Sequence, residues 1–304
     1  MEELSALELY QNYLLNQKKY SQYTITSYTE DILLFMHFLE KEDVSVFSCD
    51  KTVIRNFLES ERRRGISKTS LKRRVVALRR YYDFLLKKNI IKSNPFINIV
   101  TPKTDKKLPD FLYENEIKKL FELNKTRNDR LVYRDQAIIE LLFASGIRVS
   151  ELCSIKMIDL QLKQRIIRIK GKGNKERVVP FSFSSQNAIE IYLKEQRSQL
   201  VLLKTSNHKN YLFLNSKGNP LTPRGVEYIL SKIERELGLG LSLHPHKFRH
   251  TFATTMLDRG ADLRTIQQLL GHENLSTTQL YTHISTAKIK ENYQKYFPRV
   301  KKDN

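Results

Sequence analysis

Two arginine-containing segments in the second half of the sequence have residue types suited to binding a phosphate. In Ala144-Ser-Gly-Ile-Arg148-Val-Ser-Glu151, the arginine follows a helix-ending glycine, and the glutamate three residues on could orient it. In His246-Lys-Phe-Arg249, the histidine and the arginine are three residues apart, so a helix would bring both to one face. Arginine suits this task because its planar fork of N–H donors binds two phosphate oxygens at once.

A third segment offers a nucleophile. Leu269-Leu-Gly-His272 places a histidine at the end of a predicted helix, and Tyr281 follows nine residues later. Cutting a phosphodiester needs a nucleophile, neutralisation of charge on the non-bridging oxygens and a proton for the leaving oxygen. A tyrosine favours easy reversal, because its ordinary pKa of about 10 makes it a better leaving group than serine.

The sequence has no pattern for a metal or a nucleotide cofactor. It contains no His, Cys, Asp and Glu grouping at metal-ligand spacing, no glycine-rich phosphate loop and no acidic pair of the two-metal kind. We therefore predict no cofactor and no metal, with cationic side chains acting in their place. The net charge of +20, from 53 Lys and Arg against 33 Asp and Glu, favours a polyanionic partner such as nucleic acid.

Taken in chain order, these segments resemble the signature of the tyrosine recombinases, or phage-integrase-like proteins, and most closely their bacterial Xer-type branch. The matching order is arginine, a lysine on a hairpin, His-x-x-Arg, Leu-Leu-Gly-His and tyrosine. The resemblance covers nearly the whole chain, because the stretch from Ser67 to Lys103, with Asn94-Pro95, looks like the last helix of the family's N-terminal clamp domain.

The resemblance implies a site-specific recombinase that cuts and rejoins duplex DNA through a 3′-phosphotyrosyl intermediate, without metal or ATP. The arginines would hold the scissile phosphate, the histidines would complete its binding site, the lysine would protonate the departing 5′ oxygen and the tyrosine would attack phosphorus. The catalytic residues that it implies are Arg148, Lys172, His246, Arg249, His272 and Tyr281.

Some assignments have competitors in the sequence. Lys172 lies in a Gly-Lys-Gly turn, but Lys170 and Lys175 stand on the same predicted hairpin. A histidine beside a motif is more often a core or surface residue than a ligand, and we expect this of His244, His250 and His283.

Other functions share parts of this residue set. A phage, transposon or integron integrase has the same catalytic residues, but its usual extra N-terminal arm-binding domain or insertion is not visible. A catalytically silent DNA-binding relative would not need Tyr281 or Lys172, and a type IB topoisomerase would lack surfaces for synapsis. An RNA-binding protein would carry stacking aromatics in RNP-like strands. We therefore predict Xer-type resolution of chromosome or plasmid dimers.

The elements that position these residues fall into two predicted domains. Residues 1–100 are predicted to be helical, and the resemblance identifies them as a SAM-like core-binding domain that binds DNA. The polar, proline-bounded segment 101–110 is the predicted linker, and residues 111–304 are the predicted catalytic domain. Four helices are expected in the first domain, with starts at Ser5, Thr24, Asp50 and Ser67.

The last of these helices has an apolar stripe and a charged face. Five cations lie largely off the stripe with no interleaved acid, so they would repel one another without a counter-anion. A phosphate backbone would supply one. The predicted DNA-binding residues are therefore Lys72, Arg73, Arg74, Arg79 and Arg80.

The second domain is predicted to be mainly α-helical with a small antiparallel β-sheet. Helices are expected at 114–124 and 130–144, and alternating residues at 165–170 and 177–181 predict a β-hairpin. Further helices are expected after N-caps at Thr222, Asp262 and Ser276. With the first domain, the resemblance implies a two-domain, C-shaped clamp around DNA.

A final helix is expected at 285–297. Its apolar residues at i, i+4, i+7 and i+8 form one stripe: Ile289, Tyr293, Tyr296 and Phe297. The periodicity leaves open whether this stripe packs on its own domain or on a neighbour. The resemblance favours the neighbour, because in that family the final helix links subunits head to tail in a ring.

The resemblance also implies the partners. We expect double-stranded DNA with an inverted-repeat recombination site and a tetramer assembled on it, either of this protein alone or with a paralogue; the need for an activating DNA translocase is left open. No membrane is expected, because no run of about 18 apolar residues occurs and the N-terminus is acidic. Cys49 and Cys153, one in each half, are expected to be packing residues in a reducing, cytoplasmic compartment.

Overall fold

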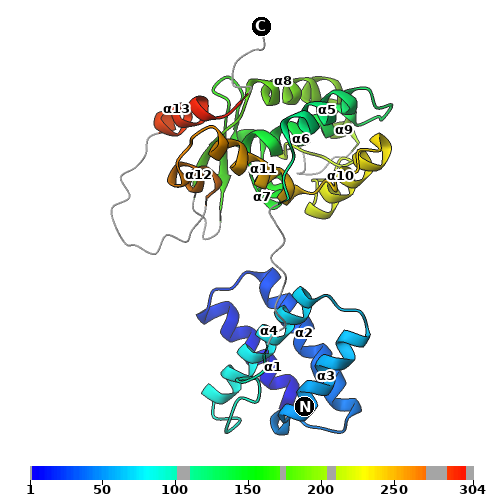
Figure 1. The fold of residues 1–304 in the computed structure, drawn as a ribbon, viewed down its shortest axis with the longest axis vertical. Coiled ribbons are helices and arrows are strands. Elements are labelled where there is room, and N and C mark those ends of the chain that lie inside the picture. Colours follow the sequence, from blue (N-terminus) through cyan, green and yellow to red (C-terminus); the bar gives the residue numbers. More distant parts are fainter. Residues whose placement is uncertain (1, 101–109, 172–175, 204–209, 272–285, 299–304) are drawn as a thin grey trace. The chain divides into compact units, whose positions relative to one another are not determined.

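The computed structural model describes residues 2–100, 110–171, 176–203, 210–271 and 286–298. The chain divides into two compact units, Met1–Lys106 and Lys107–Asn304, and each unit has its own hydrophobic core (Figure 1). The boundary between the units lies within residues 101–110. Among the helices of this described part, none is both long enough and apolar enough to span a membrane.

The N-terminal unit is helical throughout its described residues. Aromatic side chains fill much of its core; the Phe35 ring centroid, for example, lies 4.8 Å from that of Phe57 and 5.6 Å from that of Phe96. Its elements are α1 (Glu2–Asn12), the π-helix η1 (Tyr13–Gln17), α2 (Gln22–Lys41), the 3-10 helix η2 (Val46–Ser48), α3 (Lys51–Arg63) and α4 (Lys68–Lys87).

The helix starts of this unit confirm two of the four predicted N-caps. Asp50 and Ser67 cap α3 and α4 through side-chain oxygens that accept backbone N–H groups. The prediction at Thr24 is wrong, because Ser21 caps α2 one turn earlier and takes the backbone N–H of Thr24 itself. The prediction at Ser5 is also wrong, because α1 already includes this residue.

The C-terminal unit is mainly α-helical with one small sheet, as predicted. Its helices are α5 (Glu114–Lys125), α6 (Val132–Ser145), α7 (Val149–Ser154), η3 (Met157–Asp159), α8 (Phe183–Tyr192), η5 (Leu193–Arg197), α9 (Ser198–Leu202), α10 (Pro223–Leu237), α11 (Pro245–Asp258), α12 (Leu263–Leu270) and α13 (Thr286–Tyr296). Its strands are β1 (Leu160–Gln161), β2 (Ile166–Lys170) and β3 (Glu176–Pro180).

The three strands form an antiparallel sheet in the order β1-β2-β3. In the β2–β3 pair, Ile167 lies opposite Val179 and Lys170 lies opposite Glu176, which confirms the predicted hairpin. From Ile167 to Lys170, buried and exposed side chains of β2 alternate, as a strand with one face on a core requires. This register places Arg177 of β3 opposite the buried Ile169.

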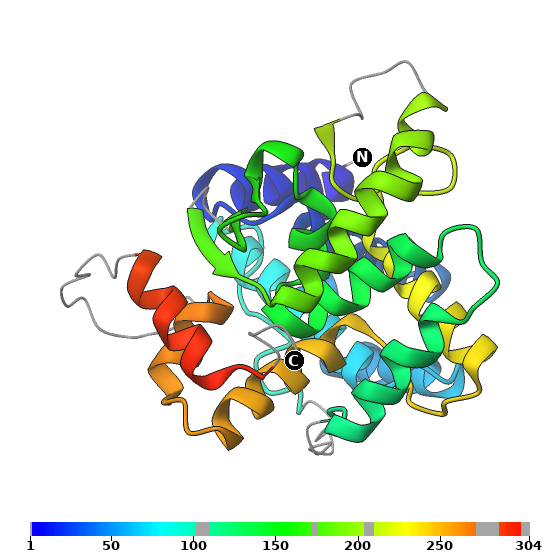
Figure 2. The same ribbon diagram turned by 90° about the horizontal axis from the view of Figure 1, so that it is seen from above.

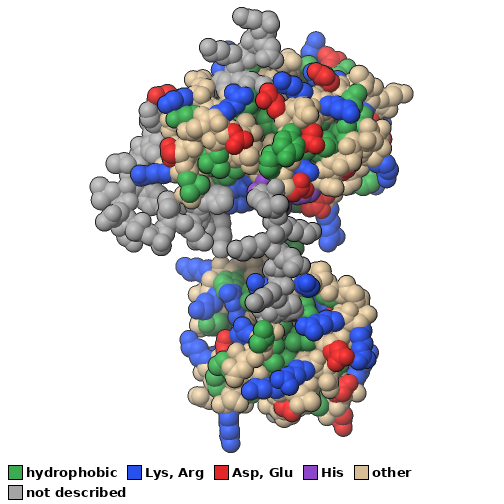
Figure 3. All heavy atoms as spheres, in the orientation of Figure 1, with side chains coloured by type: hydrophobic (Ala, Val, Ile, Leu, Met, Phe, Trp, Pro, Cys, Tyr) green, Lys and Arg blue, Asp and Glu red, His purple; other side chains and the backbone are tan. Residues whose placement is uncertain are grey.

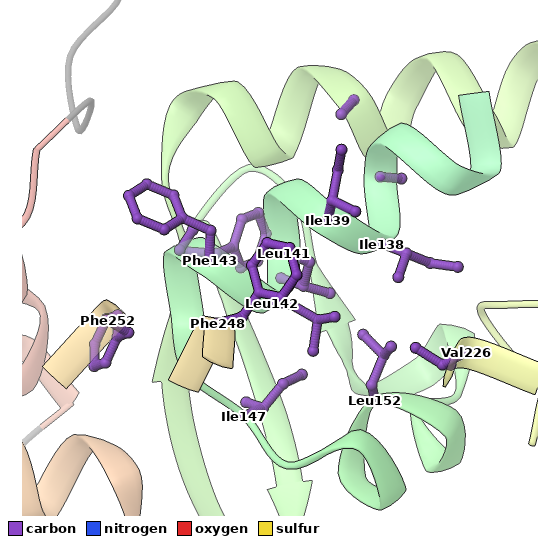
Figure 4. Close-up of a cluster of buried hydrophobic side chains, with 14 of the residues drawn as sticks. Ile138, Ile139, Leu141, Leu142, Phe143, Ile147, Leu152, Val226, Phe248 and Phe252 are labelled. Atoms are coloured by element: carbon purple, nitrogen blue, oxygen red, sulfur yellow. The ribbon is translucent and has the colours of Figure 1, made fainter. Parts of the chain in front are cut away.

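Helix α6 forms the centre of this unit. Every residue from Arg134 to Ser145 is buried, because α5, α8 and α11 pack around the helix (Figure 2). Figure 4 shows its side chains meeting those of the following turn and of α7, α10 and α11, among them Ile147, Leu152, Val226, Phe248 and Phe252. The end of α6 is therefore fixed by packing, and this fixes the position of the residues that follow it.

Helix α13 packs on its own unit. Tyr293 is 1% exposed and its hydroxyl donates a hydrogen bond of 2.8 Å to the carbonyl oxygen of Ala144. The ring centroid of Phe297 lies 5.3 Å from that of Phe143 and 5.5 Å from that of Phe252. The single chain thus adopts the intramolecular alternative, and the docking on a neighbour that the resemblance favours is not what its own fold shows.

The two cysteines are free and buried, one in each unit. Burial raises the pKa of the Cys49 thiol to about 11 and that of the Cys153 thiol to about 12. Both thiols therefore stay protonated at neutral pH, in keeping with the prediction that they are packing residues.

Candidate active site

Arg148 lies at the start of α7, directly after the turn that ends α6. Gly146 ends α6 in the left-handed region with a φ of 58°, as the sequence predicted for this glycine. A Cβ at Gly146 would lie 2.6 Å from Cδ1 of Phe252 and 2.8 Å from Cδ2 of Leu270. The chain must therefore have a glycine here in order to bring Arg148 close to α11 and α12.

The Arg148 side chain is 43% exposed and is held by Glu151, three residues on. Its Nη1 donates to Oε1 of Glu151 at 3.0 Å, and its backbone N–H donates to Oε2 at 2.8 Å. Its Nη2 donates to the carbonyl oxygen of Gly271 at 3.3 Å. The orienting role that the sequence suggested for Glu151 is therefore present in the geometry.

Arg249 reaches the same turn from α11. Its Nη1 donates to the carbonyl oxygen of Gly146 at 2.7 Å, and its Nη2 donates to that of Leu270 at 2.8 Å. Arg148 and Arg249 thus bond to neighbouring carbonyl groups at the end of α12, although about a hundred residues separate them in sequence. The two residues that sequence spacing selected as phosphate ligands lie side by side.

The positive charges of these arginines act on each other. Burial, followed by the charge of Arg148, lowers the pKa of the Arg249 guanidinium to about 10, and Glu151 acts in the opposite direction. Arg249 therefore remains charged at neutral pH, but it is held next to a like charge. An anion bound between the two groups would relieve this repulsion.

Glu151 receives a second arginine that the sequence analysis did not select. Nη1 and Nη2 of Arg177 donate to Oε1 and Oε2 of Glu151 at 2.8 and 2.9 Å. Burial raises the pKa of the Glu151 carboxyl, but hydrogen bonds and charge from Arg177, with those of Arg148, outweigh burial, so the pKa lies below its usual value. Glu151 is therefore ionised at neutral pH between two guanidinium groups.

The histidines of this region fall into different places. His246 is exposed on the first turn of α11, one turn before Arg249. His244 is the N-cap of α11, and its Nδ1 accepts the backbone N–H of Lys247 at 3.1 Å. That structural contact agrees with the expectation that His244 is not a phosphate ligand.

Three predicted catalytic residues, Lys172, His272 and Tyr281, lie outside the described residues, and so do Lys175, Ser276 and His283. Of the competing lysines on the hairpin, Lys170 is described. Its Nζ lies 3.5 Å from Oε1 of Glu176, its partner across the strand pair. Among the described residues, contacts define a site of Arg148 and Arg249 with their support from Glu151 and Arg177, and His246 lies on the same helix as Arg249.

The cations of α4 are less available than the sequence suggested. Arg73 donates to Oδ1 of Asp31 at 2.9 Å, and Arg74 pairs with both Asp31 and Glu61. These carboxylates come from α2 and α3 and are 3% and 1% exposed. The neighbouring helices thus supply counter-anions for Arg73 and Arg74, so the argument that an external phosphate must do so does not hold for them.

The other three cations differ among themselves. Arg79 donates to the carbonyl oxygens of Phe96 and Ile99, at 3.1 and 2.7 Å. Arg80 donates to the hydroxyls of Tyr20 and Tyr28. Lys72 is exposed, and no carboxylate partner is found for it among the described residues. The assignment of these residues to DNA stays a prediction, and Lys72 is its strongest member.

Family models match both units of the chain. Residues 110–288 match the phage integrase family, and residues 7–89 match the phage integrase N-terminal SAM-like domain. Together they cover most of the sequence. The resemblance drawn from the ordered motifs is therefore confirmed.

Relatives of known type match along nearly the full length. The tyrosine recombinase XerC of Bacillus licheniformis is 43% identical over 298 residues, which is 97% of each protein, and that of Bacillus subtilis is 40% identical over 299 residues, 98% of each. Among solved structures, the XerH site-specific recombinase bound to its palindromic difH substrate has a TM-score of 0.68 at 26% identity, over 88% of this chain and 78% of that one. The chain therefore belongs to the phage integrase family, as a tyrosine recombinase of the Xer type.

Proposed function

We propose that Tyr281 cuts one DNA strand at a time within a site held by Arg148 and Arg249. The tyrosine oxygen attacks the scissile phosphorus and the bond from phosphorus to the 5′ oxygen breaks, which leaves a 3′-phosphotyrosyl link. Lys172 gives the departing oxygen its proton, and a 5′ hydroxyl reverses the step on the same or another strand. His246 and His272 complete the phosphate site.

One observation carries this proposal: two guanidinium groups from distant segments are held side by side at the end of α12. Burial, and after it the charge of Arg148, disfavours the charged form of Arg249 and lowers its pKa. Negative charge gathers on the non-bridging oxygens as the phosphorus becomes pentacoordinate, and both guanidinium groups attract it. The pair is thus suited to stabilise a phosphoryl-transfer transition state.

The substrate that fits is duplex DNA with an inverted-repeat site, bound by both units as a clamp joined through residues 101–110. The similarity to XerC recombinases supports a role in the resolution of chromosome or plasmid dimers. Because this DNA lies in the cytoplasm, the protein would act there. Four protomers act together, either of this chain alone or with a paralogue, and a DNA translocase is a candidate activator.

The target site can be found with the chemistry itself. Incubation with genomic DNA, denaturation and sequencing of the fragments that stay attached to protein should recover one short motif with inverted repeats. A nicked duplex of that motif should then trap the protein covalently, because the short strand released by cleavage diffuses away and cannot be rejoined.

This duplex tests the proposed mechanism directly. Trapping should proceed at an unchanged rate in EDTA, and Tyr281→Phe should bind the duplex but form no adduct. Tyr228→Phe is a matched control, since this tyrosine of α10 is 65% exposed, and it should be trapped like the unmodified protein. Adduct formation by Tyr281→Phe, or loss of trapping in EDTA, would overturn the proposal.

A further inference from the structure

The ion pair between Arg177 and Glu151 stands directly behind the phosphate-binding arginine. Glu151 is buried, with 6% of its side chain exposed, while the Arg177 side chain is 17% exposed and that of Arg148 is 43% exposed. Both carboxylate oxygens accept two hydrogen bonds, one each from Arg177 and one each from Arg148. The carboxylate thus joins a strand residue to the residue that faces the substrate.

The bidentate contact fixes the plane of the carboxylate. A glutamate has three rotatable side-chain bonds, and without Arg177 the Glu151 carboxylate would be held only by Arg148 itself, through its backbone N–H at 2.8 Å and its Nη1 at 3.0 Å, so the two side chains could move together. Two parallel bonds from the planar Arg177 fork remove that freedom. A phosphate ligand must be held within about half an ångström of its productive position by such supporting contacts.

The second effect is electrostatic. With Arg177 absent, Glu151 and Arg148 would form a neutral pair in a partly buried site, and the carboxylate would neutralise the charge of Arg148. With Arg177 present, the group of three carries a net charge of +1. The positive charge of Arg148 then remains available to an incoming phosphate.

Arg177 also touches the turn to which both arginines bond. A Cβ at Gly271 would lie 2.9 Å from both Nε and Cζ of Arg177, so the guanidinium lies against this glycine, whose φ is 66°. The carbonyl oxygen of Gly271 accepts from Arg148, and that of the preceding residue, Leu270, accepts from Arg249. One side chain of β3 therefore supports the carboxylate and the turn together.

We propose that Arg177 is a positioning residue for cleavage, which acts through Glu151 and Gly271 to keep Arg148 oriented and its charge available to the scissile phosphate. The role rests on the proposed function of Arg148. It is distinct from that of an ordinary buried ion pair, which would stabilise the fold and affect every substrate equally. Charge on the phosphate is the property that separates the two roles.

A pair of nicked duplexes can measure this difference. In one, the scissile phosphate is normal; in the other, a methyl group replaces a non-bridging oxygen, so the methylphosphonate has no negative charge. The full-length protein is used at saturating concentration, and the rate of covalent adduct formation is measured on each duplex. For each duplex, the rate of the unmodified protein is divided by the rate of the variant, and the two ratios are then compared.

On the normal duplex, Arg177→Met should form adduct about 10- to 100-fold more slowly, as expected for loss of a supporting contact. On the methylphosphonate, its rate should approach that of the unmodified protein, in the same pattern as Arg148→Met, because charge neutralisation is no longer needed. Arg177→Lys keeps the charge and loses the fork, so it should lie between these limits on the normal duplex.

Arg168→Met is the matched control, since Arg168 is an exposed arginine on the adjoining strand β2. It should match the unmodified protein on both duplexes. If Arg177→Met were slowed by the same factor on both, or on neither, the positioning role would be wrong. If this variant fails to fold, as thermal unfolding would reveal, Arg177→Lys decides by the same comparison. Failure of the unmodified protein to form any adduct would instead reject the proposed function.

Discussion

At the scale of single residues, Gly146 determines where the phosphate site can form. Its carbonyl oxygen accepts from Arg249, and Arg148 follows two residues later. Its left-handed conformation and the closeness of Phe252 and Leu270 both exclude a side chain. Gly146 therefore ends α6 and leaves room for α11 and α12 to pack closely. It also accepts a hydrogen bond from Arg249 and sets the position of Arg148.

Gly146→Ala should lower the free energy of unfolding of the C-terminal unit by about 2 to 5 kcal/mol, the sum of left-handed strain and overpacking. Urea unfolding would measure this loss, and adduct formation should slow as well. Gly238→Ala is the matched control, because Gly238 ends α10 with a φ of 59° but a Cβ added to it would meet no atom within 4 Å. It should cost only the strain, about 1 to 2 kcal/mol. Equal losses of unfolding free energy in the two variants would mean that Phe252 and Leu270 can move to accommodate a side chain at position 146.

Residue types and spacing selected Arg148, His246 and Arg249 as candidates, because Glu151 lies three residues after Arg148 and His246 lies three residues before Arg249. Arg177 could not be selected this way. Its partner Glu151 is 26 residues away in sequence. The two side chains meet because β3 pairs with β2 in the register that places Arg177 opposite Ile169. The same limit explains the α4 cations, whose counter-anions lie 42 residues away at Asp31 and on another helix at Glu61.

At the scale of elements, α13 packs on its own unit. Its stripe was predicted, but the surface that covers it was not. A tethered partner surface acts at a high effective concentration, so intramolecular packing precedes packing on a neighbour. The docking on a neighbour that the resemblance implies would therefore require protomers gathered close together, as on a shared DNA site.

The intramolecular contact of α13 should make the stability of the C-terminal unit depend on this helix. Phe297→Ala should cost about 3 to 5 kcal/mol of unfolding free energy, since it removes a ring packed on Phe143 and Phe252. Deletion of all residues after His283 should cost more. Thermal unfolding of the dilute protein would measure both, with Leu202→Ala as control, because Leu202 is 83% exposed and should change stability by less than about 0.5 kcal/mol. An unchanged midpoint for Phe297→Ala would show that α13 does not pack this way in solution.

Most elements could be predicted because local signals mark them. Thr222 and Asp262 cap α10 and α12 as expected, and the glycines after α6, α10 and α12 are all left-handed. The failure at Thr24 has a local cause, since Ser21 and Thr24 lie within one turn of the start of α2 and only one can be the cap. At Ser5 the helix begins three residues before the predicted cap. Strand β1, with two residues, is too short to show any period.

At the scale of the whole molecule, the count of 53 Lys and Arg overstates the number of cations that DNA can use. Blue side chains are spread over the face of the N-terminal unit in Figure 3, but some cations of α4 are neutralised within the unit. Each phosphate contact releases counterions, so the slope of log affinity against log salt reports how many cations take part.

Two variants on α4 should separate these classes. Lys72→Ala should lower the salt slope by about 0.9 and leave stability unchanged, because its side chain is exposed. Arg74→Ala should instead lower the unfolding free energy by about 3 to 5 kcal/mol, because it leaves the buried Glu61 without this partner. Binding titrations at several salt concentrations and urea unfolding would measure the two effects. If the salt slope changed for Arg74→Ala and not for Lys72→Ala, Arg74 and not Lys72 would be the residue of α4 that contacts a phosphate.

The protonated, buried thiols make the chain a convenient background for site-specific dyes. Maleimides react with the thiolate, which is scarce at neutral pH when the pKa is about 11 or 12. The sequence also has no tryptophan, so its own emission comes from tyrosine. Cysteines introduced at the exposed Ser93 and Ser216, one in each unit, would therefore carry a donor and an acceptor dye while the native thiols stay unlabelled. Energy transfer between the two dyes would then follow, molecule by molecule, how the units move as DNA enters, is cut and leaves.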